Sequence, residues 1–411
     1  MHQSKSITLI NHFFYPDDVI SARIFTDMAE ELVQRGWRVR IYTSNRFCRY
    51  PKQNIQKRRE TWNGIEIYRF FRPSWDQSRN VSRIGNALWL FIVWLWAIWR
   101  HPKTSCYIIG SDPQFSQMLL PFVRLIAGRK RIVYWCYDLY PEVIIAANKN
   151  LFFKSVAQAV KPIIRFCYRF ADLIVDLGPY MSSLFKSYNS KIRRITLTPW
   201  ALREPNNIPQ QDPDYRRRLF GDNVKLGLLY SGNLGTAHDF DIFLQLARYL
   251  AKLEPGVRFT FAVRGNRVEE FRKSLRKDDT NIRVEGFVSE DELEKHLAAA
   301  DIHILSLRDK WDGIVVPSKF FGALAVGRPV LYLGSKHSDI GQWLLEYNCG
   351  LILNESNQTE VADQLVHFAQ NQTQLFEWQH NAFEAYHKYF SKQKLMDAWE
   401  EILNEKVLNS N

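Results

Sequence analysis

The feature that most constrains the fold is an alternation of short apolar segments with helix-length segments, and it runs through the chain twice. In the first half, apolar segments rich in Ile, Val and Tyr begin near Ser6, Arg38, Cys106, Arg131 and Asp172. Helix-length segments such as 22–35 separate most of them. This alternation predicts parallel strands joined by helices, in a doubly wound sheet.

The second half repeats the pattern. Its apolar segments begin near Lys225, Arg258, Ile282, Asp301, Arg328 and Gly350. Prolines at 199, 205, 209 and 213 break regular structure between the two sets. We therefore expect an α/β fold of two tandem Rossmann-like domains facing a central cleft, with residues 1–200 as the first domain and 201–385 as the second. Residues 386–411 are expected to close the chain with a helix from about Lys392 to Lys406.

Bulk composition supports this division. A chain of 411 residues is too long for one compact core, and 46% hydrophobic with 24% charged residues describes a globular protein. The five cysteines show no CxxC pairing, which favours buried thiols in a reducing cytosol. No secretion signal opens the sequence, so we expect no export.

Charge is divided unequally between the halves. Residues 1–200 hold 30 Lys/Arg and 13 Asp/Glu, a balance of +17, whereas residues 201–411 have a balance of −5. A basic half suits an anionic membrane surface or a nucleic acid, and no recognisable nucleic-acid module accompanies the charge. The basic residues concentrate at Arg46, Arg49, Lys52, Lys57, Arg58 and Arg59. The plainer interpretation of such a cluster is a solvated face.

The most apolar segment is 87–99, which contains four tryptophans. Thirteen residues are fewer than the ~20 that a membrane-spanning helix needs, so we do not expect a transmembrane span. Two interpretations remain open. The segment is either a core helix under a sheet, or a helix with one face packed and the tryptophans of the other face at a membrane interface.

Candidate site residues follow the strands of the second half. In doubly wound sheets, ligands bind at the carboxyl ends of the strands. The residues concerned are Gly232 and Asn233, then Arg264, then Gly286, Phe287 and Val288, and finally Pro317, Ser318 and Lys319. Four loops from one sheet edge are therefore expected to converge.

The last of these loops has its own signals. Pro317 and Gly327 predict a short helix, 318–326, ahead of a buried strand at 330–333. Free N–H groups at the start of that helix, with Lys319 beside them, suit an anion. The plainer alternative is an ordinary connection with a solvated lysine.

A few polar residues outside these loops are also informative. Asp239 and Asp241 form a D-x-D, but they open a helix, so we do not expect a metal there. His12 and His238 lie beside strand ends and are candidates, whereas His303 is expected to be a packed core residue.

The order of motifs resembles glycosyltransferase family 4, the retaining nucleotide-sugar transferases of GT-B fold. The resemblance covers almost the whole chain, and its closest likeness is to bacterial exopolysaccharide members of the colanic-acid type, which extend a sugar carried on a polyprenyl diphosphate at the membrane. The segments that carry it are "FFYPDDVISARIFTDMAEELVQRGWRVRIYTS", "YDLYPE", "TPWA", "LLYSGNLG", "VEGFVSEDELEKHLAAADIHILSL" and "VVPSKFFGALAVGRPVLYLG".

The resemblance implies a hexosyltransferase that works without a metal or other cofactor. It implies that Lys319 neutralises the leaving diphosphate of a nucleotide sugar, helped by Gly232, Asn233 and Arg264. It places an acceptor-side polar residue at Asp138, which would orient the acceptor hydroxyl. The other implied acceptor-binding residues are His12, Arg23 and Glu142. The acceptor would be lipid-linked or a saccharide, and the enzyme cytoplasmic and peripheral on the inner face of the plasma membrane.

Two departures from the family pattern stand out. Many relatives carry two glutamates eight residues apart, and the corresponding positions here are Gly322 and either Gly313 or Ile314. Asp309 or Asp312 is a possible substitute for the ribose contact. The lysine that commonly follows the Gly-rich turn is also absent, with Ala237 and His238 near its place.

These departures keep alternatives open. One is a catalytically inactive GT-B protein that binds carbohydrate or acts as a scaffold. Another is a GT-B phosphorylase or a nucleotide-sugar epimerase, neither of which explains the basic, Trp-rich first half.

Overall fold

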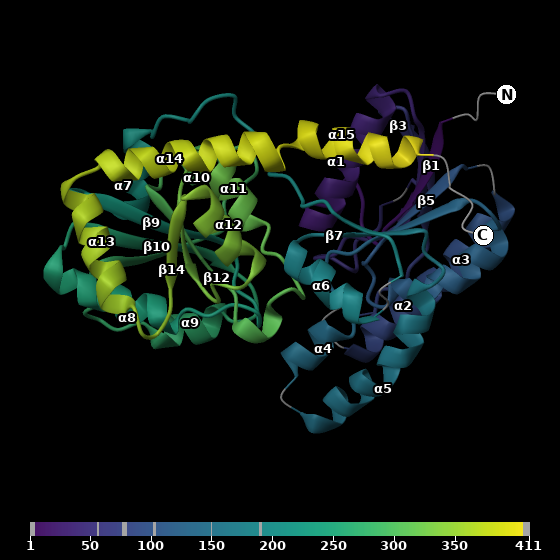
Figure 1. Ribbon diagram of the computed structural model, residues 1–411, viewed down its shortest axis with the longest axis horizontal. Helices are drawn as coiled ribbons and strands as arrows, with labels where there is room; N and C mark the ends of the chain where they lie inside the picture. The colour runs from purple at the N-terminus through teal and green to yellow at the C-terminus, as the bar shows by residue number, and fades with distance from the viewer. Residues whose placement is uncertain are drawn as a thin grey trace. The chain divides into compact units, whose positions relative to one another are not determined.

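The computed structural model describes residues 5–55, 57–75, 80–101, 104–148, 150–188 and 191–405, and the chain divides into two compact units. Unit 1 comprises residues 1–198 and 396–411, and unit 2 comprises residues 199–395. Each unit is a mainly parallel sheet surrounded by helices, as Figure 1 shows. The predicted α/β class with two Rossmann-like domains is therefore confirmed.

Unit 1 contains an eight-stranded sheet of order β3-β4-β2-β1-β5-β6-β7-β8. All neighbouring strands are parallel except the β3–β4 hairpin at one edge. The strands are β1 (Ser6–Ile10), β2 (Arg38–Ser44), β3 (Arg59–Trp62), β4 (Ile65–Phe70), β5 (Cys106–Gly110), β6 (Arg131–Trp135), β7 (Leu173–Asp176) and β8 (Arg194–Thr196).

The helices of unit 1 follow the strands as crossovers. They are α1 (Ile20–Gln34), α2 (Asn80–Arg100), α3 (Leu120–Ala127), α4 (Glu142–Ala147), α5 (Leu151–Tyr168) and α6 (Pro179–Tyr188), with a short 3₁₀ turn, η1 (Ser116–Leu119), before α3. Helix α1 forms because Ala22, Phe25, Ala29 and Leu32 recur at helical spacing and are all buried. It ends at Gly36, whose φ of +82° suits a glycine after a helix.

Helix α2 corrects the length that we assigned to the apolar segment 87–99. The helix has 21 residues, because Val81, Ser82 and Ile84 continue the helical pattern toward its start. Its stretch Val81–Arg100 is long and apolar enough to cross a membrane by length and composition, with a mean hydropathy of 1.5. The argument from thirteen residues is therefore wrong. One face of α2 nevertheless packs in the unit, since Leu90, Trp94 and Ile98 are fully buried.

The last helix, α15 (Lys392–Asn404), brings the end of the chain to unit 1. Trp399 is fully buried and its ring lies 4.9 Å from that of Trp135, centroid to centroid. Arg35 donates to Asp397 at 2.7 Å and to Glu400 at 3.2 Å. The end predicted for this helix, Lys406, lies outside the described residues.

Unit 2 contains a six-stranded parallel sheet of order β11-β10-β9-β12-β13-β14. Its strands are β9 (Leu226–Asn233), β10 (Val257–Arg264), β11 (Ile282–Glu285), β12 (Ile302–Ser306), β13 (Val330–Leu333) and β14 (Gly350–Leu353). Its helices are α7 (Pro213–Phe220), α8 (Asp241–Leu253), α9 (Val268–Ser274), α10 (Leu293–Ala298), α11 (Lys319–Ala325), α12 (Asp339–Tyr347), α13 (Gln358–Gln370) and α14 (Thr373–Ala385). A short 3₁₀ turn, η2 (Asp309–Trp311), and a π-helical turn, η3 (Tyr386–Phe390), also belong to the unit.

The core of unit 2 occupies both faces of this sheet. Along β9, Leu228 and Tyr230 belong to a cluster with α8 and α13, whereas Leu229 belongs to a separate cluster with α7. Successive side chains of a strand point to opposite faces, so both faces are covered by helices. Only the edges of the sheet remain open for a ligand, and in a parallel sheet the carboxyl edge is the usual place.

Candidate functional site

The predicted loops of unit 2 meet at the carboxyl edge of its sheet. Asn233 and Arg264 end the adjacent strands β9 and β10 and pair with each other, and Gly232 pairs with Val263 one residue earlier. The loop after β12 leads to Pro317 and Ser318, and Lys319 begins α11. Helix α11, Lys319–Ala325, and strand β13 agree with the predicted 318–326 and 330–333 within a residue.

Lys319 is the centre of this group. Its Nζ donates to the Tyr230 hydroxyl at 2.7 Å and to the Asn233 carbonyl oxygen at 3.0 Å, and lies 4.1 Å from the centroid of the Tyr230 ring. A Cβ placed on Gly232 would meet the Lys319 side chain at 3.6 Å. The half-buried ammonium has lost much of its hydration, which lowers the pKa of Lys319 to about 7.

The first turn of α11 offers fewer free N–H groups for an anion than the sequence predicts. The helix has seven residues, so its dipole is small. The N–H groups of Phe320 and Phe321 already donate to the carbonyl oxygens of Pro317 and Ser318, and the Ser318 side chain makes no cap hydrogen bond. The capacity of this loop for an anion therefore rests on the Lys319 side chain rather than on the helix.

Arg264 and Phe287 form a second contact at the same edge. The Arg264 guanidinium lies 3.5 Å from the centroid of the Phe287 ring. Gly286 and Val288 flank this ring beyond the end of β11, and a Cβ on Gly286 would meet nothing within 4 Å. The structure thus brings Gly232, Asn233 and Lys319 together, and separately Arg264 with Phe287.

His238 lies beside Lys319 and is neutral. Burial, with the nearby Lys319 charge, lowers the pKa of His238 to about 3. Its Nδ1 lies 2.5 Å from the Ser306 carbonyl oxygen and must be the donor there, which leaves Nε2 as a hydrogen-bond acceptor. His303, by contrast, is buried in β12 with its Nε2 2.9 Å from the Leu297 carbonyl oxygen, so its assignment to the core is confirmed.

Asp312 occupies the loop between β12 and α11. Burial, strengthened by the charges of Asp309 and Asp339, raises the pKa of Asp312 to about 7. The Asp312 Oδ1 is buried without a hydrogen-bond partner among the described residues. Of the two substitutes suggested for the absent glutamate, Asp312 is partly buried and Asp309 is exposed.

Asp239 has a structural role. Its Oδ1 accepts from the N–H groups of Phe240 and Asp241, and its Oδ2 accepts from the Arg308 Nε at 3.0 Å. The carboxylate therefore organises the start of α8. No group of three or more potential metal ligands occurs among the described residues.

Unit 1 gathers a second polar group at the carboxyl edge of its own sheet. The His12 Nδ1 lies 3.1 Å from the Asp112 Oδ1, joining the loops after β1 and β5. Burial lowers the pKa of His12, although Asp112 opposes the change. Arg72, which follows β4, is fully buried nearby, and burial lowers its pKa to about 10.

Asp138 belongs to the same group. Its backbone N–H donates to the Ser111 hydroxyl at 3.2 Å, which ties the β6 loop to the β5 loop. The residue is exposed by area, yet protein atoms crowd its carboxyl and, with the Asp112 charge, raise the pKa of Asp138 to about 6. The Arg83 charge of α2 acts in the opposite direction.

The other two predicted acceptor-side residues lie differently. Arg23 is in the first turn of α1, directly after the β1 loop. Glu142 accepts from the Tyr188 hydroxyl and pairs with Lys161 at 3.0 Å, so its carboxylate joins α4 to α5 and α6. The structure therefore places Glu142 in an internal helix contact, apart from the pair of His12 and Asp112.

Sequence reasoning missed several members of these groups. Asp112 directly follows the apolar segment 106–111, so the rule that found Asp138 would also have found it. Tyr230 was counted only as a strand residue, although it lies two residues before Gly232. Arg83 carried no sequence signal, because its position depends on how α2 packs.

The outer helices of unit 1 expose a large apolar surface. Helix α3 packs against both α2 and α5. We call the following residues the exposed apolar face: Val81, Ile84, Leu88, Trp89, Ile92, Trp96 and Trp99 of α2, Phe122 and Leu125 of α3, and Leu151, Phe152, Phe153, Val156, Ile163 and Phe166 of α5. None of these three helices contains Asp or Glu. Exposed patches of this size mark interaction surfaces.

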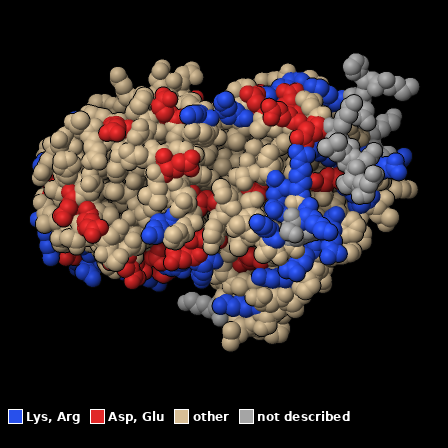
Figure 2. All heavy atoms as spheres, in the orientation of Figure 1, with Lys and Arg blue, Asp and Glu red and all other residues tan. Residues whose placement is uncertain are grey.

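The basic cluster at 46–59 is less available than its sequence suggests. Arg46 is buried and donates to the carbonyl oxygens of Arg72 and Pro51. Arg49 pairs with Asp18, and Lys57 with Glu60. As Figure 2 shows, Lys and Arg still gather over unit 1 on the face in view, while both signs mix over unit 2.

Comparison with known proteins supports the same fold. No family model matches the chain. Over 297 residues, 69% of this chain and 71% of the relative, it is 25% identical to a probable glycosyltransferase, WbjE, of Pseudomonas aeruginosa. It is 27% identical to mannosylfructose-phosphate synthase of Agrobacterium fabrum, over 47% of this chain and 43% of the relative.

Solved structures resemble the whole chain. Sucrose-phosphate synthase from Thermosynechococcus elongatus matches 97% of this chain and 98% of its own with a TM-score of 0.69 and 12% identity. HepE of Anabaena, solved with UDP and glucose, matches 98% of this chain and 100% of its own with a TM-score of 0.69 and 13% identity. WaaG, a glycosyltransferase of lipopolysaccharide biosynthesis, covers 97% of this chain and 100% of its own with a TM-score of 0.65 and 15% identity. The fold is GT-B.

Proposed function

We propose that this protein is a retaining hexosyltransferase of family 4, which moves a sugar from a nucleotide diphosphate to a lipid-linked or saccharide acceptor in cell-surface polysaccharide synthesis. The observation that carries the proposal is Lys319, held against Tyr230 and Asn233 at the carboxyl edge of the unit 2 sheet. Both curated relatives bear glycosyltransferase or synthase names, and HepE binds UDP and UDP-glucose.

Unit 2 is the proposed donor side. A diphosphate beside Lys319 favours the charged ammonium and raises its pKa above the value of about 7 in the free protein. Lys319 then neutralises the negative charge that grows on the leaving group as the sugar–phosphate bond breaks. Arg264 and the backbone at Gly232 and Asn233 supply further donors, and the proposal requires no metal.

The glutamate that bonds the nucleotide ribose in the family pattern is absent here, so another residue must make this contact. Asp312 replaces the absent glutamate in our proposal, because its Oδ1 is buried without a partner among the described residues. With a pKa of about 7, the carboxyl either accepts from a ribose hydroxyl or donates to one.

Unit 1 is the proposed acceptor side. A retaining transferase lets the acceptor hydroxyl attack from the face that the diphosphate leaves, so a leaving-group oxygen takes the proton. Asp138 then orients the hydroxyl rather than serving as a strong base. A pKa of about 6 keeps its carboxylate largely ionised at neutral pH.

The exposed apolar face supports a membrane-peripheral, cytoplasmic protein and a lipid-linked acceptor. Apolar side chains reach outward from three neighbouring helices that lack carboxylates, while Arg100, Lys154 and Arg169 supply cations. Tryptophans and cations together are the composition of a surface that binds an anionic bilayer. The face replaces the 46–59 cluster as the main contact.

The alternative is a GT-B protein that binds carbohydrate, or acts as a scaffold, without turnover. The glycine at 322, where many relatives carry a glutamate, is the observation that favours it.

One assay tests the proposal. The full chain is incubated without added metal with a panel of nucleotide sugars, uridine donors first, and release of nucleoside diphosphate is measured alongside binding by isothermal titration. We expect binding and slow hydrolysis for one donor. Binding without any release, with or without saccharide acceptors, would favour the inactive protein, and an absolute need for magnesium or manganese in binding would contradict the metal-free donor site.

A further inference from the structure

A pocket of about 530 Å³ lies in unit 2 at the amino-end edge of the sheet, opposite Lys319. It is bounded by residues 208–211, by α7, by the starts of β12 and β13, and by α14. Its volume is within the range of small-molecule sites. Neither the proposed donor chemistry nor the proposed acceptor chemistry uses this edge.

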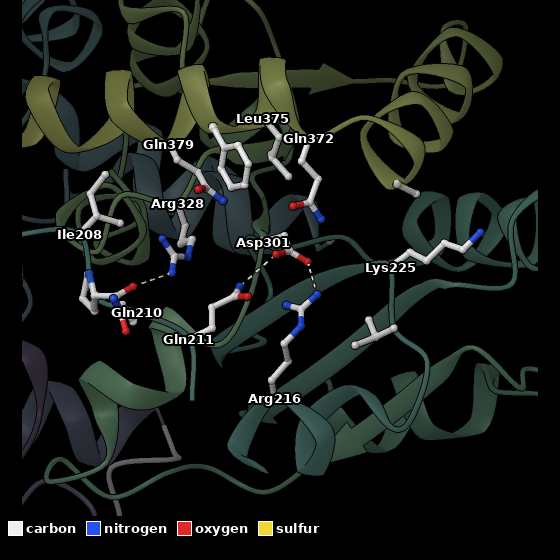
Figure 3. Close-up of a pocket in the computed structure, with 14 residues that line it drawn as sticks. Ile208, Gln210, Gln211, Arg216, Lys225, Asp301, Arg328, Gln372, Leu375 and Gln379 are labelled. Atoms are coloured by element: carbon white, nitrogen blue, oxygen red, sulfur yellow. Dashed lines mark hydrogen bonds and ion pairs between the residues drawn. The ribbon is translucent and has the colours of Figure 1, made fainter. Parts of the chain in front are cut away.

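The charged side chains at the floor of the pocket are held by hydrogen bonds and ion pairs. Arg328 is 3% exposed, and its guanidinium donates to five backbone carbonyl groups, including that of Ala300 at 2.7 Å. Beside it, Asp301 accepts from Arg216 at 2.6 Å and from Gln211 at 2.9 Å, as Figure 3 shows. Lys225 pairs with Glu254 at 2.9 Å. Two of the three cations thus pair with carboxylates, and the third, Arg328, is held by backbone carbonyl groups.

The groups left over are neutral amides. Gln379 of α14 is only 9% exposed and lines the pocket. In Figure 3 its amide points from α14 toward Arg328, and the amide of Gln372 points toward Asp301. Gln379 and Gln372 therefore offer amide donors and acceptors to a polar ligand in the pocket.

An aromatic ring completes the lining. Phe376, one turn of α14 before Gln379, is 58% exposed although it borders the pocket, and the neighbouring Leu375 is buried. An amide presents a donor and an acceptor side by side, which matches two adjacent hydroxyl groups, and an aromatic face packs against the C–H groups of a pyranose ring.

We propose that this pocket binds a neutral saccharide of one or two pyranose units, through Gln379, Gln372 and Phe376. The inference deepens the proposed function, since the ligand would be a segment of the glycan that the enzyme extends. Such a site would keep a saccharide chain on the protein while its other end is elongated.

Saturation-transfer difference NMR of the full chain with maltose, cellobiose and lactose tests this proposal. We expect at least one disaccharide to bind, and Gln379→Leu to weaken that binding about tenfold or more, because the hydroxyl groups lose their only deep partner. Phe376→Ser, at an exposed position, should weaken it with an unchanged melting temperature. Gln374→Leu, the same substitution on an exposed turn of α14, is the matched control and should have no effect.

The inference is overturned if no disaccharide binds, if both pocket variants bind like the control, or if inorganic phosphate alone displaces the sugar. Titration of UDP into the same samples separates this result from the proposed function. If saturating UDP or Lys319→Ala abolishes the disaccharide signal, the sugar occupies the donor side and the pocket is not its site. If disaccharide binding persists while no nucleotide binds, the pocket stands and the proposed transferase fails.

Discussion

Both units place polar side chains at the carboxyl edge of a parallel sheet, but the helices that cover the two sheets differ. In unit 2, every helix except α11 contains at least one carboxylate, and the exposed surface carries both signs. In unit 1, α2, α3, α5 and α6 contain none. The same architecture therefore carries charged helices in unit 2 and outer helices without carboxylates in unit 1, and in our proposal the latter contact a bilayer.

The polar groups at the carboxyl edges of the two sheets also differ in charge. In unit 2, Lys319 lies beside Gly232, and the pKa of Lys319 is lowered to about 7. In unit 1, the pKa of Asp138 is raised to about 6, and the pair of His12 and Asp112 belongs to the same group. Burial produces both shifts, because it disfavours whichever form is charged. In the proposed function, Lys319 binds the anionic leaving group and Asp138 orients the acceptor hydroxyl.

The largest effect is expected at Lys319. Lys319→Ala should preserve the fold and lower turnover by ~10² or more at saturating donor, since one donor to the leaving group is lost. Lys336→Ala, an exposed lysine in the loop after β13, is the matched control and should leave turnover unchanged. Initial rates at saturating donor measure both. Full turnover in Lys319→Ala would remove the role that we assign to the donor edge.

The outer helices of unit 1 provide the next test. Changing Trp96, Trp99, Leu125 and Phe152 together to Ser should reduce co-sedimentation with anionic vesicles about tenfold or more, because each side chain loses apolar area that the bilayer would bury. All four are at least half exposed, so the melting temperature should stay the same. Leu345→Ser, on the exposed side of α12 in unit 2, is the control.

Two results would break this contrast between the units. If the fourfold variant keeps vesicle binding, the exposed apolar face has another occupant. If instead the wild type is a dimer that the variant dissociates in gel filtration, that occupant is a second copy of the chain. Binding that is equal for neutral and anionic vesicles would show that the +17 balance of residues 1–200 plays no part.

The two units also differ in how far sequence predicted them. All six strands of unit 2 were expected, because each is a short apolar segment bounded by glycine or polar residues. In unit 1 the hairpin β3–β4 and the strand β8 were missed. The hairpin turns at Asn63 and Gly64, both with positive φ, which is a strong hairpin signal that the search for parallel strands passed over.

The candidate site was also only partly predictable from the sequence. Lys319, Gly232 and Asn233 could be grouped from sequence because parallel strands end at one edge, and the structure brings them into contact. The partner Tyr230 and the orientation of Arg83 depend on side-chain packing, which no spacing rule contains. Glu142 is a residue that the motif predicted at the acceptor side. In the structure it contacts Lys161 and Tyr188 instead, and the sequence gave no sign of these contacts.

A pH dependence should follow from the two shifted groups. Donor binding needs a protonated Lys319, whose pKa of about 7 means that the ammonium is present below that pH and lost above it. Donor affinity in isothermal titration should therefore fall by up to about tenfold per pH unit above 7. Lys319→Arg keeps its charge and should flatten this dependence.

The pH profile of kcat/KM tests Asp138 in the same way. Protonation of Asp138 should lower activity below pH 6, and this loss should be absent in Asp138→Asn.

The smallest effect is expected at Gly322, within α11 of unit 2. Its φ is not positive, and an added Cβ would meet only the Leu297 Cδ1, at an ordinary 3.6 Å. Gly322→Ala should therefore stabilise unit 2 by ~0.5–1 kcal/mol, since alanine loses less conformational entropy in a helix. Gly265→Ala is the opposite case, because its φ is +125° and a Cβ would lie 2.6 Å from the Leu234 carbonyl oxygen. Chemical denaturation of the full chain, followed by a nucleotide-binding signal for unit 2, distinguishes the two. A loss of stability in Gly322→Ala would show that α11 has no room for a side chain at this position, which would leave Asp312 as the proposed ribose contact.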